Sequence, residues 1–291
     1  MKILSFGSLN YDHVYEMDHF VEPKETQSSL AYARGFGGKG LNQSIALAKA
    51  GLEVYHAGRV GNDGQDFIDY LNRYGVNTEY LMKDDSIATG HAIIEVCRGQ
   101  NCIILHGGAN QAIDSRQIDE VLSHFDKDDV LLIQNEISNL DYLIDKADEK
   151  GMLIVFNTAP MNEKVFTYPL DKIDIFVVNE IEGAGLAQTE SRDYKEIIKA
   201  LKEKYPSRQI VMTVGESGSY YICDDTLIHQ DAYQVEAVDT TAAGDTFTGF
   251  FLASYLKDRD IQKALDLAAR ASSITVQGKG AAQSIPSIEE L

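Results

Sequence analysis

Short continuous apolar runs alternate with longer amphipathic runs along most of this chain. Continuous runs are typical of strands buried on both faces, and the longer runs repeat with helical spacing. We predict strands at Ile3–Gly7, Val54–Val60, Val130–Gln134, Leu153–Asn157, Ile175–Asn179, Ile210–Val214 and Tyr220–Cys223. The predicted helices are Gln43–Lys49, Asp66–Tyr74, Ser115–Phe125, Leu140–Lys150, Tyr194–Lys204 and Thr246–Leu256. This order predicts an α/β fold with a doubly wound, mostly parallel sheet flanked by helices, which binds ligands at the carboxyl ends of its strands.

Two pairs of segments break the alternation, because no helical run separates their members. They are Tyr11–Met17 with Ser28–Ala33, and Gly90–Val96 with Cys102–His106. We interpret them as a small antiparallel β sheet that projects from the core. One face of such a sheet needs a cover, which a substrate or a second subunit would provide. Cys97 and Cys102 flank the second predicted turn, so their spacing leaves a bridge between them open.

Composition narrows the classes of function. The chain has 291 residues, which fits a single domain over 1–291, and its formal net charge of -19 would repel nucleic acid. No apolar run reaches the roughly 18 residues that a membrane span needs. Three cysteines without metal-binding spacing, and an N-terminus without a hydrophobic signal core, favour a cytoplasmic location. We therefore expect no nucleic-acid partner and no membrane partner.

The stretch Ala237–Gly249 carries the strongest chemical signal. A strand-like entry at Val235–Val238 leads into small residues and then into the helical run. Backbone amides at such a junction, together with the helix dipole, favour an anion. Asp245 would repel that anion, so its presence indicates a proton acceptor beside a phosphate site, as phosphoryl transfer to a hydroxyl requires. The alternative is a helix N-cap aspartate after a tight turn.

A second glycine-rich stretch, Gly35–Gly40, precedes Asn42 and a helix. It formally fits the dinucleotide fingerprint G-x-G-x-x-G, but the preceding run is polar and short rather than a buried strand. We interpret it as a close approach of backbone amides to a polyhydroxylated ligand, with Asn42 offering a donor and an acceptor. The alternative is a glycine turn capped by Asn42. Asn10 and Asp12 lie two apart on an extended segment, which suits a vicinal diol.

Further polar residues follow predicted strands. Glu136 follows Val130–Gln134. Asn179 and Glu182 lie three residues apart at a helix start, and this spacing suits either ligands of metal-bound water or a pair that caps the helix. The strand end at Thr213–Gly218 turns through glycines and could line a nucleotide pocket or form an ordinary hairpin.

In this order, the motifs resemble the ribokinase-like carbohydrate kinases of the PfkB family, with the closest pattern among its ribose kinases. The resemblance extends from Gly7–Asp12 through Gly37–Gln43 to the C-terminal loop. Ala269 and Gly278 depart from the family pattern at positions that concern the adenine contact and the potassium site.

The resemblance implies a role for each matching residue. Asp245 would be the base, and amides of Ala242, Ala243 and Gly244 would bind the transferred phosphoryl group. The implied sugar ligands are Asn10, Asp12, Gly38, Lys39, Asn42 and Glu136. The implied ATP site contains Asn179, Thr213, Gly215, Gly218 and Gly244, with Glu182 acting on Mg²⁺ through water. The implied K⁺ site contains Asp239, Thr241, Thr275, Gly278, Gly280 and Ser284. Residues of about 11–35 and 88–107 would form a lid that also pairs two subunits in a homodimer.

The implied activity is transfer of the γ-phosphate of ATP to the primary hydroxyl of a pentose, D-ribose to ribose 5-phosphate, with Mg²⁺ and K⁺ as cofactors. The same chemistry on deoxyribose, a hexose or a nucleoside is the nearest alternative. A non-catalytic sugar or nucleotide sensor is a further one, although Asp245 and Gly244 disfavour it. The last is a nicotinamide-dependent oxidoreductase that uses Gly35–Gly40.

Overall fold

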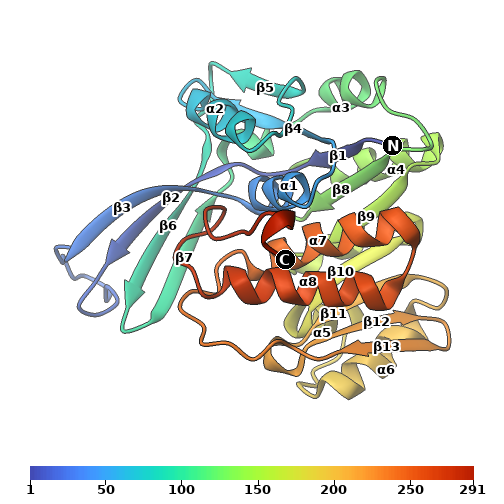
Figure 1. Cartoon of the computed structure of the whole chain (residues 1–291). Coiled ribbons are helices and arrows are strands. Elements are labelled where there is room, and N and C mark those ends of the chain that lie inside the picture. The colour runs from blue at the N-terminus through green and yellow to red at the C-terminus, as the bar shows by residue number, and fades with distance from the viewer.

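A sheet of nine strands forms the centre of the protein in the computed structural model, which describes residues 1–291 (Figure 1). Its order is β13-β12-β11-β10-β9-β8-β1-β4-β5, and all neighbours from β11 to β5 are parallel, whereas β12 and β13 are antiparallel. The strands are β1 (Ile3–Phe6), β4 (Val54–Gly61), β5 (Leu81–Asp84), β8 (Val130–Gln134), β9 (Leu153–Asn157), β10 (Ile175–Asn179), β11 (Gln209–Thr213), β12 (Ser219–Cys223) and β13 (Thr226–Gln230). The predicted α/β class and the mostly parallel sheet are confirmed.

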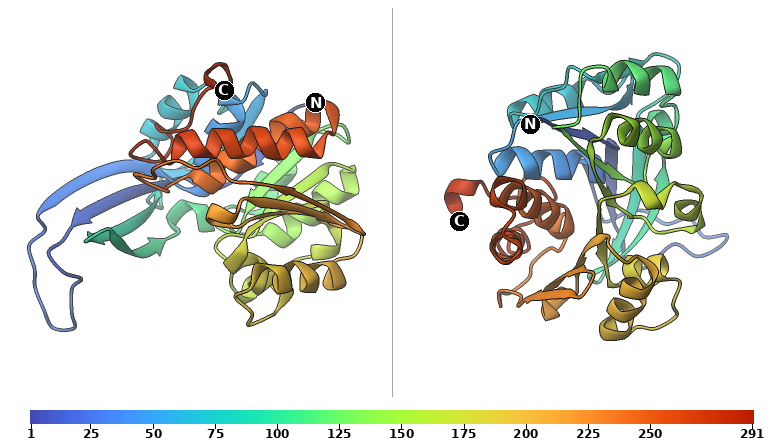
Figure 2. Two further views of the ribbon diagram at one scale, coloured as in Figure 1. Left: turned by 60° about the horizontal axis from the view of Figure 1, so that its bottom comes forward. Right: turned by 90° about the vertical axis from the view of Figure 1, so that its right-hand side faces the viewer.

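Helices cover both faces of this sheet. One face packs against α1 (Lys39–Lys49), α2 (Gln65–Arg73), α7 (Ala243–Asp258) and α8 (Ile261–Thr275). The other packs against α3 (Ser115–Leu122), α4 (Leu140–Lys150), α5 (Glu180–Ala187) and α6 (Tyr194–Lys204), as the edge-on view of Figure 2 shows. Successive residues of a strand point to opposite faces, so Val130 enters one apolar core and Leu131 the other. This double burial explains why the strands consist of continuous apolar runs.

A separate sheet of four strands projects from one end of the molecule, at the left of Figure 1. Its strands are β2 (Asn10–Glu16), β3 (Ala31–Gly37), β6 (Gly90–Cys97) and β7 (Gln100–His106). The pairs β2–β3 and β6–β7 are antiparallel, as predicted. The two pairs meet through parallel strands β2 and β6, because β2 follows β1 and β6 follows β5, and both leave the parallel sheet in the same direction.

The turn of the β6–β7 hairpin is formed by Arg98 and Gly99, both with positive φ. Cys97 is buried and Cys102 is exposed, and both are free thiols. The bridge that their spacing left open is therefore not formed.

One predicted strand is wrong. Val235–Val238 forms no strand, and both Val235 and Val238 are exposed. The amide of Val238 instead donates to Val276 O at 2.7 Å, so this segment attaches to the chain after α8 rather than to the sheet. The two glycine-rich motifs start their helices earlier than predicted, at Lys39 and Ala243.

The remaining regular structure consists of short 3₁₀ helices. They are η1 (Gly108–Gln111), η2 (Glu163–Thr167), η3 (Leu170–Lys172), η4 (Gly215–Ser217) and η5 (Ile288–Glu290). None of the helices combines the length and the apolar character that a membrane span would need.

Candidate active site

The helices α1 and α7 approach each other closely enough for their first turns to share one polar site. Gly249 faces Ala46, and a β-carbon on Gly249 would lie only 2.5 Å from that of Ala46. One helical turn before this contact lie Asp245 on α7 and Asn42 on α1. The glycine therefore brings together two residues that are 203 positions apart in the sequence.

The carboxylate of Asp245 is held at both oxygens. Asn42 Nδ2 donates to Oδ2 at 3.0 Å, and Gln43 Nε2 donates to Oδ1 at 2.9 Å. Asp245 is 8% exposed, so these bonds replace most of its contact with water. Asn42 Oδ1 is buried and has no hydrogen-bond partner. This free acceptor lies beside the carboxylate, where a ligand hydroxyl could donate to it.

The backbone at the start of α7 is arranged for an anion. Ala242 precedes the helix in the left-handed conformation, with φ of 62°, and no side chain caps the first amides. The amide of Ala243 donates to Thr240 O at 3.2 Å, so it is partly used by the turn. A β-carbon on Gly244 would meet nothing within 4 Å, so open space lies against the helix N-terminus. An acidic residue and an uncapped helix start are thus neighbours, as the sequence predicted.

A cavity of about 370 Å³ opens at this helix start. It is lined by Gly244 and Phe247 of α7, by Ala269 of α8, and by the turn after β11. Four of the five residues predicted for an ATP site, Thr213, Gly215, Gly218 and Gly244, line it. Asn179 does not. Its largely apolar walls suit a planar heterocycle, and Ala243 and Gly244 at the start of α7 line it as well. Tyr233 and Phe247 also line it, although Tyr233 lies outside every motif and Phe247, within the Ala237–Gly249 stretch, was assigned no role.

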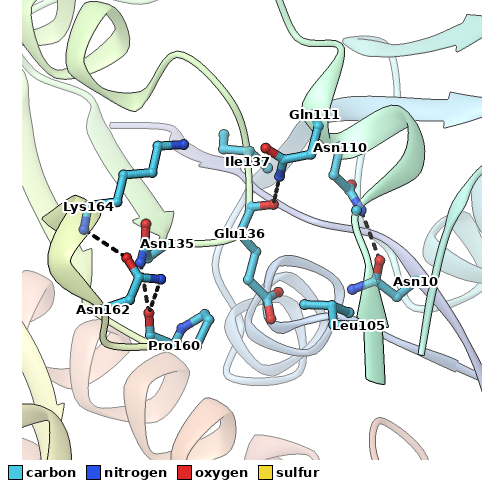
Figure 3. A pocket seen from close by; sticks show the side chains of 11 residues that line it. Asn10, Leu105, Asn110, Gln111, Asn135, Glu136, Ile137, Pro160, Asn162 and Lys164 are labelled. Atoms are coloured by element: carbon cyan, nitrogen blue, oxygen red, sulfur yellow. Dashed lines mark hydrogen bonds between the residues drawn. The ribbon is translucent and has the colours of Figure 1, made fainter. Parts of the chain in front are cut away.

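A second group of polar residues lies where β8 ends and where β2, a strand of the small sheet, begins. Glu136 accepts a hydrogen bond from Lys39 N at 3.0 Å and another from Ser8 Oγ. Asn110 Nδ2 donates to Asn10 Oδ1 at 2.9 Å and fixes that side chain. Figure 3 shows Glu136 between Asn10 and Leu105 on one side and Asn162 and Lys164 on the other, in a cavity of about 240 Å³.

Sequence reasoning did not find Ser8 or Asn110. Ser8 belongs to the first motif but was given no role, and Asn110 lies on η1, outside every motif. The cavity next to Glu136 is also lined by the amide side chains of Gln111, Asn135 and Asn162, which were not predicted either.

The charges of the site depend on one another. Burial, with the nearby charge of Glu136, raises the pKa of Asp12 to about 6. Burial also raises the pKa of Glu136, although Lys39 opposes this effect. Burial alone would lower the pKa of Lys39, but Asp245, Glu136 and Glu182 outweigh it and raise that pKa. Lys39 is therefore a stable cation in the middle of the site.

Asn179 and Glu182 form the capping arrangement that the sequence left open. Glu182 N donates to Asn179 Oδ1 at 2.8 Å, and Asn179 N donates to Glu182 Oε2 at 3.0 Å. Burial raises the pKa of Glu182, with the Asn179 amide and Lys39 opposing it. Both residues therefore support the start of α5, and Glu182 remains close enough to Lys39 and Asp245 for the charges of those two residues to act on its pKa.

The C-terminal loop folds onto Asp239. The amides of Thr241 and Gly280 donate to its two carboxylate oxygens at 2.9 and 3.0 Å. Ser284 Oγ donates to Gly280 O at 2.8 Å, and the amide of Gly278 donates to Thr275 O at 3.1 Å. Burial opposes the ionisation of Asp239, but the bonds from Thr241 and Gly280 hold its pKa below the usual value. Of the six residues predicted for K⁺, Thr241 and Gly280 therefore bond directly to the carboxylate of Asp239, Ser284 bonds to Gly280, and Gly278 bonds to Thr275.

Comparison with known proteins defines the class to which this fold and site belong. The pfkB family carbohydrate kinase profile matches residues 1–288, so the chain belongs to this family. It is an enzyme of the phosphotransferase class that uses an alcohol group as acceptor.

Particular members resemble the chain over its whole length. The ribokinase of Staphylococcus aureus is 33% identical, covering 100% of this chain and 98% of its own. The deoxyribokinase of Salmonella typhi is 31% identical, covering 100% and 97%. The structure of Arabidopsis thaliana ribokinase complexed with ribose and ATP has a TM-score of 0.85 and 29% identity, covering 98% of this chain and 95% of that one.

Proposed function

We propose that the protein transfers the γ-phosphate of ATP to the primary hydroxyl of D-ribose and forms ribose 5-phosphate. One observation carries this proposal. The carboxylate of Asp245, held by Asn42 and Gln43, lies beside the uncapped start of α7. A base next to an anion site is what phosphoryl transfer to an alcohol needs.

In this proposal Asp245 accepts the proton of the primary hydroxyl as the hydroxyl attacks the γ-phosphate. Each of its oxygens accepts one bond from the protein, so lone pairs remain for the substrate. The amide of Ala242, just before α7, and the first-turn amides of Ala243 and Gly244 stabilise the charge on the transferring group. Lys39, which stays protonated, adds a positive charge between the two ends of the site.

The sugar would lie between Asp245 and Glu136. Asn10, Asp12, Gly38, Lys39, Asn42 and Glu136 would hold its other hydroxyls. The buried free acceptor on Asn42 supports this assignment, because a sugar hydroxyl would satisfy it.

ATP would bind in the cavity lined by Thr213, Gly215, Gly218 and Gly244, with its phosphates toward α7. No group of three or more acidic, histidine or cysteine side chains that could hold a metal occurs in the structure. Mg²⁺ would therefore bind mainly to the ATP phosphates, with Glu182 and Asn179 reaching it through water. Bound there, it would neutralise phosphate charge.

K⁺ fits the loop around Asp239. Its donor set consists of one ionised carboxylate and several main-chain and hydroxyl oxygens, from Thr241, Thr275, Gly278, Gly280 and Ser284, which are ligands for a hard cation. This loop adjoins the turn before α7, so a bound cation would stabilise the anion site.

We further propose that the small sheet is the lid of the site, formed by residues of about 11–35 and 88–107 within a single kinase domain over 1–291. Asn10 and Asp12 lie on the same face of it as Val14, Ile94, Ile103 and Leu105. We call this the inner face. The apolar part of the inner face includes Ile103, which is 57% exposed, and would pair with a second copy of the protein in a homodimer.

The use of ATP would place the enzyme in the cytoplasm.

Deoxyribose is the second candidate acceptor, because the Salmonella typhi deoxyribokinase is about as similar to this chain as the ribokinases are. The two sugars differ by one hydroxyl group. The side chains of Asn10, Asp12 or Glu136 could form a hydrogen bond with this hydroxyl, or the site could lack a contact to it.

A coupled assay of ADP release tests the proposal. The purified protein is given MgATP with ribose, deoxyribose, fructose or a nucleoside, with and without K⁺. We expect the highest kcat/KM with ribose, and a higher rate with K⁺. A higher kcat/KM for deoxyribose, a hexose or a nucleoside would replace the ribose assignment. ADP release that no sugar accelerates would reject the kinase.

A further inference from the structure

A chain of side-chain hydrogen bonds runs from Asp245 into the interior of the large sheet. Gln43 Nε2 donates to Asp245 Oδ1 at 2.9 Å, and Gln134 Nε2 donates to Gln43 Oε1 at 2.7 Å. Gln43 and Gln134 have no exposed surface at all. Gln134 is the last residue of β8 and makes no contact with the space where a substrate would lie.

The carboxylate fixes the direction of this chain. An ionised carboxylate only accepts hydrogen bonds, so Gln43 must turn its NH₂ group toward Asp245. The carbonyl of Gln43 then faces Gln134, and only a donor at that position can complete the chain. The other end of the Gln134 amide, Oε1, is buried without a partner, so the bond to Gln43 is the one hydrogen bond that this side chain makes. If Gln43 were turned over, its carbonyl oxygen would face the carboxylate and repel it.

The fold makes room for this arrangement. A β-carbon on Gly7 would lie 2.3 Å from Gln134 Oε1, so only glycine at position 7 leaves space for the buried amide. A buried polar chain with an unsatisfied end is costly, and it persists where the surrounding structure gains from it.

We propose that Gln134 is a positioning residue for the phosphoryl transfer. Its amide donor fixes the orientation of Gln43, and Gln43 in turn holds Asp245 toward the substrate hydroxyl. This inference rests on the proposed function, in which Asp245 is the base. Gln134 acts only through Gln43 and touches neither the sugar nor ATP.

The first test replaces the donor with an apolar side chain of similar length. In Gln134→Met, Gln43 loses the bond that orients it, and Asp245 loses its fixed position. We expect kcat to fall about 10- to 100-fold, while KM for the sugar changes less than about twofold. The sugar used is the one that the wild type phosphorylates fastest.

Gln117→Met is the matched control. Gln117 is also a buried glutamine, but it donates to Gly58 O at 2.7 Å, accepts from Arg59 and has no bond to the site. It reports the effect of losing a buried amide elsewhere in the fold. A kcat for Gln134→Met equal to that of this control would overturn the inference.

The second test uses pH to restore the donor. In Gln134→Glu, an ionised side chain would accept from Gln43 and turn it over, whereas a protonated carboxyl can donate as Gln134 does. Burial raises the pKa of such a carboxyl. We expect the ratio of the variant's kcat to that of the wild type to rise as pH falls. The role is also supported if Gln134→Met has lost turnover while the kcat of Gln134→Glu equals that of the wild type at every pH.

A purely structural role would leave that ratio low and independent of pH, and this result would overturn the inference. Thermal melts and sugar binding by calorimetry show whether each variant is folded. If the wild type itself phosphorylates no sugar, the proposed function fails. If the wild type is active and both Gln134 variants behave like the control, only the positioning role fails.

Discussion

Lys39 is a cation on which three acidic residues of the candidate site act. Asp245, Glu136 and Glu182 all stabilise its charge, and Asp12 lies close enough to Glu136 to feel that residue's charge. Without ligands this group is strongly negative, so the carboxylates compete for the same positive charge. Burial and the charge of Glu136 both act against the ionised form of Asp12.

Sugar binding should therefore depend on pH through Asp12. Its pKa is raised to about 6, so acid converts the carboxylate to a neutral carboxyl that accepts hydroxyl bonds poorly. We predict that KM for ribose at pH 5 is about tenfold higher than at pH 8, since roughly one molecule in ten is then ionised. Steady-state kinetics at constant ionic strength measure this. An Asp12→Asn variant should have a raised KM for ribose that is the same at pH 5 and at pH 8.

The free energy of unfolding should depend on the charge of Asp12 in the sense opposite to sugar binding, and fall as this carboxyl ionises. Its folded pKa lies above the ordinary value of 3.8, so folding favours the protonated form. That contribution is fully present below 3.8 and is lost as pH rises through about 6. We predict that Asp12→Asn melts at a higher temperature than the wild type at pH 8, and that this difference shrinks at pH 4. Calorimetry that found no such convergence would contradict the raised pKa.

Single residues could be predicted where their own motif defines them. Asp245 follows small residues at a helix start, and Asn42 follows glycines, so their types and positions pointed to an anion site and a hydroxyl site. Gln43 and Asn110 could not be found in this way. Gln43 acts through Asp245, which is 202 residues away, and Asn110 acts through Asn10, which is 100 residues away. Such pairing follows only from the fold.

At the scale of elements, the contact between α1 and α7 sets the geometry of the site. Gly249 and Ala46 let the two helices touch, and the polar residues one turn earlier then reach each other. The two glycines of α7 therefore have different roles, because Gly249 faces a helix and Gly244 faces open space.

Gly249→Ala should separate the helices. Its β-carbon would lie 2.5 Å from that of Ala46 and 2.8 Å from main-chain atoms of α1, so the backbones must move. We predict a loss of about 1–3 kcal/mol in the free energy of unfolding, together with a lower kcat. Urea unfolding and kinetics on the same preparation measure both. Unchanged stability would show that the helices are not in close contact.

Gly244→Ala is the comparison within the same helix. Its β-carbon meets no protein atom within 4 Å, and alanine favours a helix, so stability should stay the same or rise. The added methyl group would occupy the space against the amides where we place the phosphates. We predict a KM for ATP that is raised roughly tenfold, with KM for ribose unchanged. An unchanged KM for ATP would argue against phosphate binding at this helix start.

Regular elements were predictable where burial is uniform. The bounds of β8, β9 and β10 match the predicted ones, because each is a continuous apolar run between polar residues. The Val235–Val238 segment also begins and ends with valine but forms no strand, and the amide of Val238 donates to Val276 O instead. Composition alone cannot distinguish these cases.

At the scale of the whole molecule, the projecting sheet offers two faces for association. Ile103 lies on the inner face, and Ile104, which is 66% exposed, lies on the opposite face because successive strand residues alternate. The sequence predicted this sheet, but not the parallel pairing of β2 with β6. That pairing depends on where two distant strands leave the core, which local patterns do not encode.

The proposed homodimer can be tested with this pair of residues. We predict that Ile103→Lys shifts the protein from dimer to monomer in sedimentation velocity, because it places a charge within an apolar contact. Ile104→Lys has the same chemical change on the opposite face and should leave the dimer intact. A wild type that sediments as a monomer, or two variants that behave alike, would reject pairing through the inner face.

The central claim is that Asp245 removes the proton of a sugar hydroxyl beside the start of α7. The most direct test is Asp245→Asn, with the ³¹P NMR spectrum of the product recorded for the wild type and the variant supplied with ribose and MgATP. We predict that the wild type forms ribose 5-phosphate and that the variant binds both substrates but turns over about 10²- to 10⁴-fold more slowly. Near-normal turnover by the variant would contradict the account.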